Sequence, residues 1–223
     1  GESDLCFIDG KFYLFVSCEV ETPQPNDVAD VLGVDLGIVN LASDSDGESF
    51  SGEKVEDNRR KFAHRRRNLQ RKQTKSAKRK LKKISGKQAR YQKDTNHRIS
   101  KAIVAKAQRT NRGIALEALK GIRDRVRARR KQRARLHNWG FFQLKSFILY
   151  KAQRIGIPVF EVDPRNTSIE CSHCGYVDKR NRKSQSDFLC VSCGFSAPAD
   201  IHAARNIRAR ALINAPMVST FTG

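Results

Sequence analysis

Val31-Leu32-Gly33-Val34-Asp35-Leu36-Gly37 is the segment from which the fold of this 223-residue chain is best read. A short apolar run that contains glycines and carries a single acid predicts a buried strand. Residues 38–50 continue it with a second strand, a turn at Asp44-Ser45-Asp46-Gly47 and a third strand. Ile114-Ala115-Leu116-Glu117 predicts a further short strand, which again ends in an acid.

Helical patterns alternate with these strands. A basic helix is expected from about Val55 to Lys83, with an interruption at Gly86, and a second helix from Lys87 to Arg109. Three more elements are expected: a helix with broad apolar coverage over 137–154, a strand over 158–162, and a helix over 199–212 that opens at Pro198. The resulting order, β-β-β-α-β-α-β-α, indicates an α/β fold.

The front of the chain follows a different pattern. Residues 5–21 predict a β-hairpin, because Asp9-Gly10 favours a tight turn whose twist matches that of the strands. Residues 22–26, with two prolines, predict a linker. Cys6 and Cys18 lie in apolar surroundings, and we expect both to be buried thiols.

The other four cysteines form a regular pattern, Cys171-x2-Cys174-x15-Cys190-x2-Cys193, which is typical of a four-cysteine zinc site. Two intervening residues let a tight turn aim both thiolates at one tetrahedral centre, and Gly175 and Gly194 follow the two pairs. Four thiolates leave no open coordination position, so the zinc is expected to be structural. A redox dithiol and an iron–sulfur site are the alternatives. His173 lies between two ligands and is expected at the surface.

Positive charge is concentrated in two internal segments. The formal net charge is +21; residues 58–90 hold sixteen Lys or Arg and no acid, and residues 120–135 hold nine against the single Asp124. Such segments attract polyanions, and we interpret them as nucleic-acid-binding. The simpler alternatives are solvated helix faces or a disordered tail. An anionic membrane surface is less favoured, because the segments lack the aromatic and leucine face of interfacial helices.

Neither a membrane-spanning segment nor a secretory leader is expected. No run reaches the ~20 apolar residues of a membrane span. No charged-then-apolar leader is present, and the chain starts Gly1-Glu2 rather than with Met, so a fragment, a processed product or a naturally short form is expected.

Three acids stand out by their positions. Asp35 lies in an apolar strand, Glu117 ends another, and Asp200 lies in the first turn of the last helix. Each has a simple explanation on its own: Asp200 complements a helix N-terminus, and the other two are strand-end surface groups. A shared metal site is the competing hypothesis.

Several segments together are similar to one family. The chain resembles the TnpB (OrfB) proteins of insertion sequences, relatives of the type V CRISPR effector nucleases, over about residues 31–210. The resemblance rests on Gly33–Gly37, Ala115–Glu117, Thr167–Gly175 and Ala199–Ile207, and also on Asp94–Ser100 and the helix from Trp139 through Tyr150-Lys151-Ala152 to Gly156.

The resemblance implies a RuvC-like, RNase H-like mixed sheet flanked by helices, with a zinc ribbon inserted before the last helix. It assigns catalysis to Asp35, Glu117 and Asp200, with Asp35 as the ligand that bridges two Mg²⁺ ions. It implies an RNA-guided DNA endonuclease that works with a guide RNA and target DNA in a prokaryotic cytoplasm, associated with the nucleoid.

The implied organisation has five parts: a hairpin left from an N-terminal lobe (1–26), the RuvC-like core (27–166) with a basic helical insertion (about 55–109), the zinc ribbon (167–196), the last helix (197–213) and a flexible tail (214–223). Family members carry a recognition lobe of well over a hundred residues before the first RuvC strand, whereas about thirty residues precede it here. Activity therefore calls for a missing lobe or a homo-oligomer.

Nucleic-acid contacts are expected from the basic segments and from the ribbon loop 179–183. The expected side chains are Arg59, Arg60, Arg65, Arg66, Arg67, Arg71, Lys72, Arg79, Lys82, Arg123, Arg127 and Arg205. Arg205 and Arg208 lie within about two turns of Asp200. Each either contacts the scissile phosphate or is plain surface charge, and the sequence favours neither alternative. Two other functions remain: a catalytically silent nucleic-acid-binding protein of this fold, and a resolvase-like nuclease without a guide.

Overall fold

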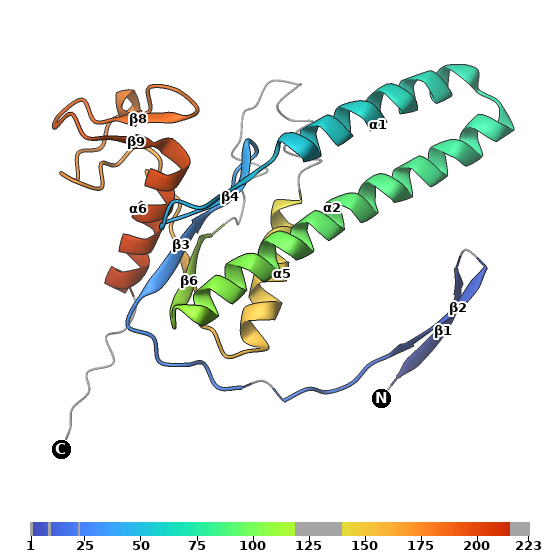
Figure 1. The fold of residues 1–223 in the computed structure, drawn as a ribbon, viewed down its shortest axis with the longest axis horizontal. Helices are drawn as coiled ribbons and strands as arrows, with labels where there is room; N and C mark the ends of the chain where they lie inside the picture. Colours follow the sequence, from blue (N-terminus) through green and yellow to red (C-terminus); the bar gives the residue numbers. More distant parts are fainter. Residues whose placement is uncertain (1, 9, 22, 119–139, 215–223) are drawn as a thin grey trace.

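The computed structural model describes residues 2–8, 10–21, 23–118 and 140–214. Five strands form a mixed sheet in the order β5-β4-β3-β6-β7 (Figure 1). β3 pairs antiparallel with β4 and parallel with β6, and β6 pairs parallel with β7. The predicted strands are confirmed as β3 (Val31–Asp35), β4 (Asn40–Asp44), β5 (Ser49–Ser51), β6 (Gly113–Glu117) and β7 (Val159–Val162).

Helices cover both faces of the sheet (Figure 1). α2 (Lys75–Arg109) and α5 (Phe141–Gln153) pack on one face, where Leu32 and Val34 of β3 meet Ile103 and Ile148. α6 (Ala199–Asn214) packs on the other face. Because side chains alternate along a strand, the odd-numbered residues of β3 and β6 face α6. The predicted α/β fold is confirmed.

The long helical hairpin differs from the prediction at its turn. α1 (Glu53–Lys72) ends at Gln73, which has a φ of +48°, and α2 starts after Thr74. The Thr74 hydroxyl accepts a hydrogen bond from the Ala77 amide at 3.2 Å, a helix N-cap that the sequence reading missed. The predicted break at Gly86 is wrong: α2 runs through it, since one glycine costs a helix only about 1 kcal/mol.

Close contact between β3 and α6 depends on one glycine. A Cβ on Gly33 would lie 2.1 Å from the Ala204 carbonyl oxygen and 2.7 Å from the Arg208 backbone nitrogen. Only a residue without a side chain lets the helix backbone lie this close to the strand. Gly33 thereby brings the start of α6 to the same edge of the sheet as the end of β3.

The cysteine module lies between β7 and α6. It contains a short 3-10 helix, η1 (Lys179–Asn181), and a small antiparallel sheet of β8 (Asp187–Leu189) and β9 (Ser196–Pro198). Asn181, fully buried, connects its two halves: the side-chain amide donates to the carbonyls of Ile169 and Tyr176, and its oxygen accepts from the Val191 amide.

The N-terminal hairpin is confirmed as β1 (Ser3–Ile8) and β2 (Lys11–Val16). It leaves large apolar side chains uncovered; Phe12 exposes 73% of its surface and Leu14 65%. The expectation that both front cysteines are buried is therefore wrong: Cys6 is half-buried and Cys18 exposed, because the described part of the chain does not cover the hairpin.

Two expectations fall outside the description. The basic segment 120–135, with Arg123 and Arg127, and the tail beyond Asn214 lie outside the described residues. Within those that are described, no helix is both long enough and apolar enough to span a membrane.

Candidate functional site

The structure brings the three acids to one edge of the sheet. Asp35 is the last residue of β3 and Glu117 the last of β6, two parallel neighbours in which Val34 pairs with Leu116. Both acids occupy positions that face α6, and Asp200 lies in the first turn of that helix. Strand alternation and the order of the strands thus place three carboxylates that are distant in sequence around one region.

The electrostatics of this edge centre on Asp35. Burial, together with the negative charges of Glu117 and Asp200, raises the pKa of the Asp35 carboxyl to about 7, and Arg182 opposes the rise. Burial likewise raises the pKa of Glu117, while a hydrogen bond from Thr167 opposes that rise. The edge therefore has negative charge that its own residues compensate only in part, and a cation would relieve this.

The two outer acids have partners of their own. Asn40 donates to Asp200 Oδ2 at 3.0 Å, and the Arg182 guanidinium donates to Asp200 Oδ1 at 3.3 Å. The Thr167 hydroxyl donates to Glu117 Oε1. The sequence reading gave these three partners no role at the acids. The sequence marks Thr167 only as the start of a family segment, and Arg182 only as part of the basic ribbon loop.

A buried lysine donates a hydrogen bond to the main-chain carbonyl of Glu117. The Lys145 ammonium lies 2.9 Å from a Glu161 carboxylate oxygen and 3.2 Å from the Glu117 carbonyl oxygen. It thereby connects α5 to the ends of β6 and β7.

The arginines of α6 have other partners. Arg208 makes two 2.9 Å hydrogen bonds to the Asp30 carboxylate, so its charge is directed to the start of β3. Arg205 Nε lies 3.5 Å from the Ser45 carbonyl oxygen. For Arg208, the ion pair favours the surface-charge alternative; Arg205 remains a predicted nucleic-acid contact.

The four predicted zinc ligands meet at one point. The sulfur atoms of Cys171, Cys174, Cys190 and Cys193 all lie within 4.8 Å of one another. Two of the separations are 3.7 and 3.6 Å, close to the ~3.8 Å edge of a tetrahedron whose metal–sulfur bonds are about 2.3 Å. Among the described residues this is the one group of three or more metal-binding side chains gathered tightly enough to share an ion. The three carboxylates are spread more widely.

The cysteine module is anchored on α6, the helix that carries Asp200. His202 is fully buried; its ring stacks on Phe188 at 3.6 Å and its Nε2 accepts a hydrogen bond from the Ser172 amide. Burial, together with the charges of Arg205 and Arg182, lowers the pKa of His202 to about 4, so the ring is neutral at pH 7. Asn206 donates to the carbonyls of Thr167 and Glu170. His173 is exposed, as expected, beside Phe195.

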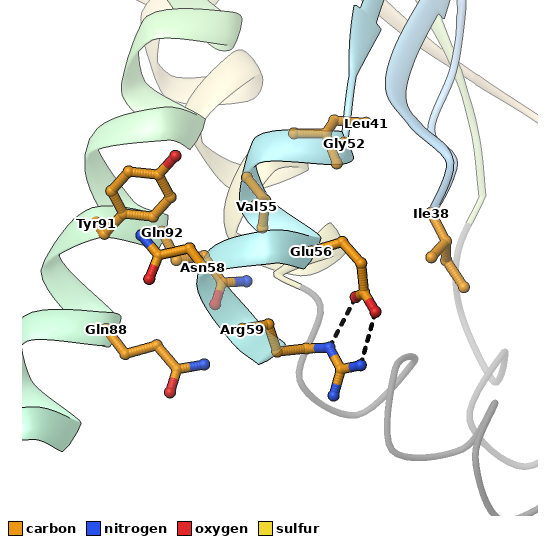
Figure 2. Close-up of a pocket in the computed structure, with 10 residues that line it drawn as sticks. All are labelled: Ile38, Leu41, Gly52, Val55, Glu56, Asn58, Arg59, Gln88, Tyr91 and Gln92. Atoms are coloured by element: carbon orange, nitrogen blue, oxygen red, sulfur yellow. Dashed lines mark hydrogen bonds and ion pairs between the residues drawn. The ribbon is translucent and has the colours of Figure 1, made fainter. Parts of the chain in front are cut away.

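The predicted nucleic-acid contacts on the helical hairpin divide into two sets. Figure 2 shows a hollow where α1 and α2 join the sheet, lined by Ile38, Tyr91 and Gln92 among others; there Arg59 makes two 2.7 Å bonds to Glu56. Arg60 also pairs with Glu56, and Arg66 bonds Gln88. Farther along the hairpin the cations are exposed and form no ion pair within the described part: Arg65, Arg67, Arg71, Lys72, Arg79 and Lys82.

Two protein-family models match the chain. The model described as "Probable transposase" (OrfB of IS605) matches residues 15–123, and that of the Cas12f1-like TNB domain matches residues 141–207. The first therefore covers β3 to β6, and the second covers α5, the cysteine module and most of α6.

Curated relatives agree with these models. The chain is 35% identical over 216 residues to the CRISPR-associated endodeoxyribonuclease Cas12f1 of Sulfoacidibacillus thermotolerans, covering 88% of this chain and 50% of that protein. It is 30% identical over 220 residues to the "Putative RNA-guided DNA endonuclease InsQ" of Escherichia coli K12, covering 90% and 54%. The TnpB-like protein MJ0751 of Methanocaldococcus jannaschii is 35% identical over 57% of the chain. The chain thus spans about half the length of the first two relatives.

Solved structures match the fold. A Cas12f1–sgRNA–target DNA complex aligns with a TM-score of 0.64 at 23% identity, covering 92% of this chain and 55% of that one. A CRISPR-Cas12f ternary complex aligns with the same TM-score at 24% identity, covering 88% and 41%. With the mixed sheet and the four-cysteine cluster, this confirms the predicted RNase H-like, RuvC-like fold with an inserted zinc-ribbon module.

Proposed function

The chain belongs to the TnpB (OrfB) family of insertion-sequence proteins, relatives of the Cas12f nucleases, and on that premise we propose that it is the nuclease part of an RNA-guided DNA endonuclease. Its partners would be a guide RNA and a target DNA. Because it spans about half of its relatives, the whole activity also calls for a recognition lobe or a second copy.

One observation carries the proposal: a buried carboxylate whose ionisation is opposed by two neighbouring acids. Asp35 has a pKa raised to about 7 by burial and by Glu117 and Asp200, and Arg182 is the cation that offsets them. A group of this kind is stabilised when a divalent cation supplies positive charge. Carboxylate oxygens are the hard ligands that Mg²⁺ prefers, so the donor set fits the expected ions.

The roles of the residues follow from their positions. The carboxylates of Asp35, Glu117 and Asp200 would together hold the Mg²⁺ ions, with Asp35 as the ligand that the ions share and Glu117 and Asp200 as the flanking ligands. When bound, the ions would activate water and stabilise the leaving oxygen of the phosphodiester. Thr167 and Asn40 orient the carboxylates of Glu117 and Asp200 by hydrogen bonds, and Arg182, bonded to Asp200, would approach the phosphate being cut.

The cysteine cluster would hold one structural zinc ion. Its sulfur separations fit a tetrahedral ion with four thiolates, and such a site keeps no position open for a substrate. The ribbon would then be a scaffold that carries Arg182 to Asp200. Its loop 179–183 would contact a nucleic-acid strand close to the cut.

The exposed cations of the helical hairpin would bind phosphates of the guide–target duplex or of the displaced strand, reading charge and shape rather than sequence. The same role is proposed for the basic segment 120–135, with Arg123 and Arg127, and for Arg205. The uncovered hairpin of residues 1–26 would belong to a recognition lobe.

The test is cleavage of plasmid DNA with Mg²⁺, with and without co-purified RNA, for the wild-type chain and for Asp35→Ala. When a recognition lobe is supplied, we expect cutting by the wild type and none by Asp35→Ala, since the loss of Asp35 removes the shared ligand. The matched control is Asp30→Ala, which removes an acid from the position just before the same strand.

Three results would contradict the proposed function. Equal inertness of the wild type and Asp35→Ala in every condition, including with a recognition lobe supplied, means a catalytically silent binder. Cutting that needs no RNA means a resolvase-like nuclease. Equal cutting by wild type and Asp35→Ala means that the carboxylates are not the centre.

A further inference from the structure

Two sequence segments have no part in the nuclease site, yet the structure joins them. Asp94–Ser100 lies in α2, and Tyr150-Lys151-Ala152 closes α5. His97 stacks on Phe147 with ring centroids 4.0 Å apart, and Tyr150 meets Phe147 edge-on at 5.8 Å. We name His97, Phe147, Tyr150 and Lys151 the aromatic platform.

A lysine at the platform has an unused hydrogen-bond donor. The Lys151 ammonium donates to the His97 carbonyl and to the Ser100 hydroxyl, both at 2.7 Å. An ammonium has three N–H groups, so one remains without an acceptor among the described residues. Lys151 Nζ also lies 5.9 Å from the ring centroids of both Phe147 and Tyr150.

The charge around the platform is mainly positive. Burial lowers the pKa of the His97 imidazole, the charges of Lys151 and Lys93 lower it further, and Asp94 opposes this. Burial and the charge of Lys101 likewise lower the pKa of Lys151. Lys151 forms no ion pair within the described residues. Of the three rings, Tyr150 is exposed and His97 and Phe147 are half-buried. A cation without an ion-pair partner beside a partly exposed aromatic cluster is a surface for an anionic, flat ligand.

Rings and cations in this arrangement suit a nucleotide chain. Tyr150 exposes 36% of its surface, and Phe142, on the same helix, exposes 45%. A base that stacks on a ring leaves its phosphate close to the ammonium group, and such stacking needs no particular sequence. Duplex DNA keeps its bases inside and cannot use the rings.

We propose that the aromatic platform, flanked by Lys93 and Lys101, binds single-stranded nucleic acid by stacking bases on its rings and holding phosphates with its lysines. The platform lies on the α2/α5 layer, on the opposite side of the sheet from α6 (Figure 1). It is a second nucleic-acid surface, and its occupancy does not depend on cleavage at Asp35.

The test measures binding with the nuclease centre disabled. The full chain with Asp35→Asn is titrated with fluorescein-labelled oligothymidylate, with RNA of matched length and with a matched duplex. Tyr150→Leu should weaken single-strand binding about tenfold and leave duplex binding unchanged. The DNA and RNA arms distinguish which strand binds. An oligonucleotide carrying 5-iodouracil should photo-crosslink to residues 147–150 in the parent.

Two variants that each remove one charge keep the proposal testable if Tyr150→Leu misfolds. Lys101→Gln, on an exposed side chain, should weaken binding and reduce the salt slope by about one; Arg109→Gln, at the far end of α2, should leave the slope unchanged.

Unchanged single-strand affinity in Tyr150→Leu, with cross-links mapping elsewhere, overturns the proposal. Unchanged affinity together with loss of self-association in light scattering also overturns it and assigns the platform to a second copy. Plasmid cleavage by the wild type is scored separately, so failure of the platform and failure of the nuclease site are distinguishable.

Discussion

Arg182, in the zinc-ribbon module, donates a 3.3 Å hydrogen bond to Asp200 Oδ1 on α6. The same guanidinium donates to the Gln185 carbonyl at 2.8 Å, which fixes its direction within the ribbon. The module, for which the sequence predicts a zinc site and a basic loop but no contact with the acids, therefore contributes a cation directly to the acidic edge. Through its charge it also lowers the pKa of Asp35.

Arg182→Gln should reduce cleavage about 100-fold, because it removes a positioned cation from beside the phosphate being cut. The rate is measured at saturating nucleic acid, so that weaker binding does not contribute. Arg180→Gln is the control: it removes a charge from the same loop, where Arg180 pairs with Asp178 at the surface. If the two variants cut at equal rates, Arg182 has no part in the reaction.

Asp35→Asn should stabilise the magnesium-free protein at pH 8. A carboxyl with a pKa of about 7 in the folded chain and 3.8 as its ordinary value binds more protons when folded between those pH values, so stability falls as pH rises through that window. The shift corresponds to at most about 4 kcal/mol. Thermal melts should show the gain at pH 8 and little of it below pH 4.

Magnesium should reverse the order of the melting temperatures of the wild type and Asp35→Asn. Added Mg²⁺ is expected to raise the melting temperature of the wild type and to leave Asp35→Asn unchanged, since the variant lacks the shared ligand. A variant that melts below the wild type at pH 8 without magnesium would show that the buried charge is not costly.

Cys190→Ser should remove the ribbon's zinc. Elemental analysis of the reduced wild type is expected to give one zinc per chain, and the variant should lose it and melt at lower temperature, because zinc binding contributes about 10 kcal/mol to folding such modules. Cys18→Ser is the control: that exposed thiol lies outside the cluster, so zinc content should be unchanged. Reduced wild type without metal would contradict the zinc assignment.

Gly33→Ala and Gly86→Ala should change stability in opposite directions. At Gly33 the new Cβ would collide with the Ala204 carbonyl, so α6 must move, at about 3 kcal/mol or more. At Gly86 the nearest atom is 3.4 Å away, on the flexible end of Arg90, and alanine should stabilise α2 by about 0.5–1 kcal/mol. Urea unfolding of both variants measures the difference; equal effects would show that α6 does not depend on Gly33.

Sequence alone determined the local chemistry. The cysteine spacing predicted the ligand cluster, the apolar run around Asp35 predicted β3, and the family resemblance assigned the three acids, since these patterns are local in the chain. It misplaced the turn of the helical hairpin, because the Thr74 cap outweighs the weak break at Gly86.

Tertiary structure decided which distant groups meet. Register between β3 and β6 brings Asp35 and Glu117 to one edge, Gly33 lets α6 bring Asp200 there, and the ribbon then adds Arg182. The aromatic platform likewise exists only where α2 and α5 pack. Contacts of this kind depend on strand order and helix packing between remote segments, which no pattern of neighbouring residues encodes.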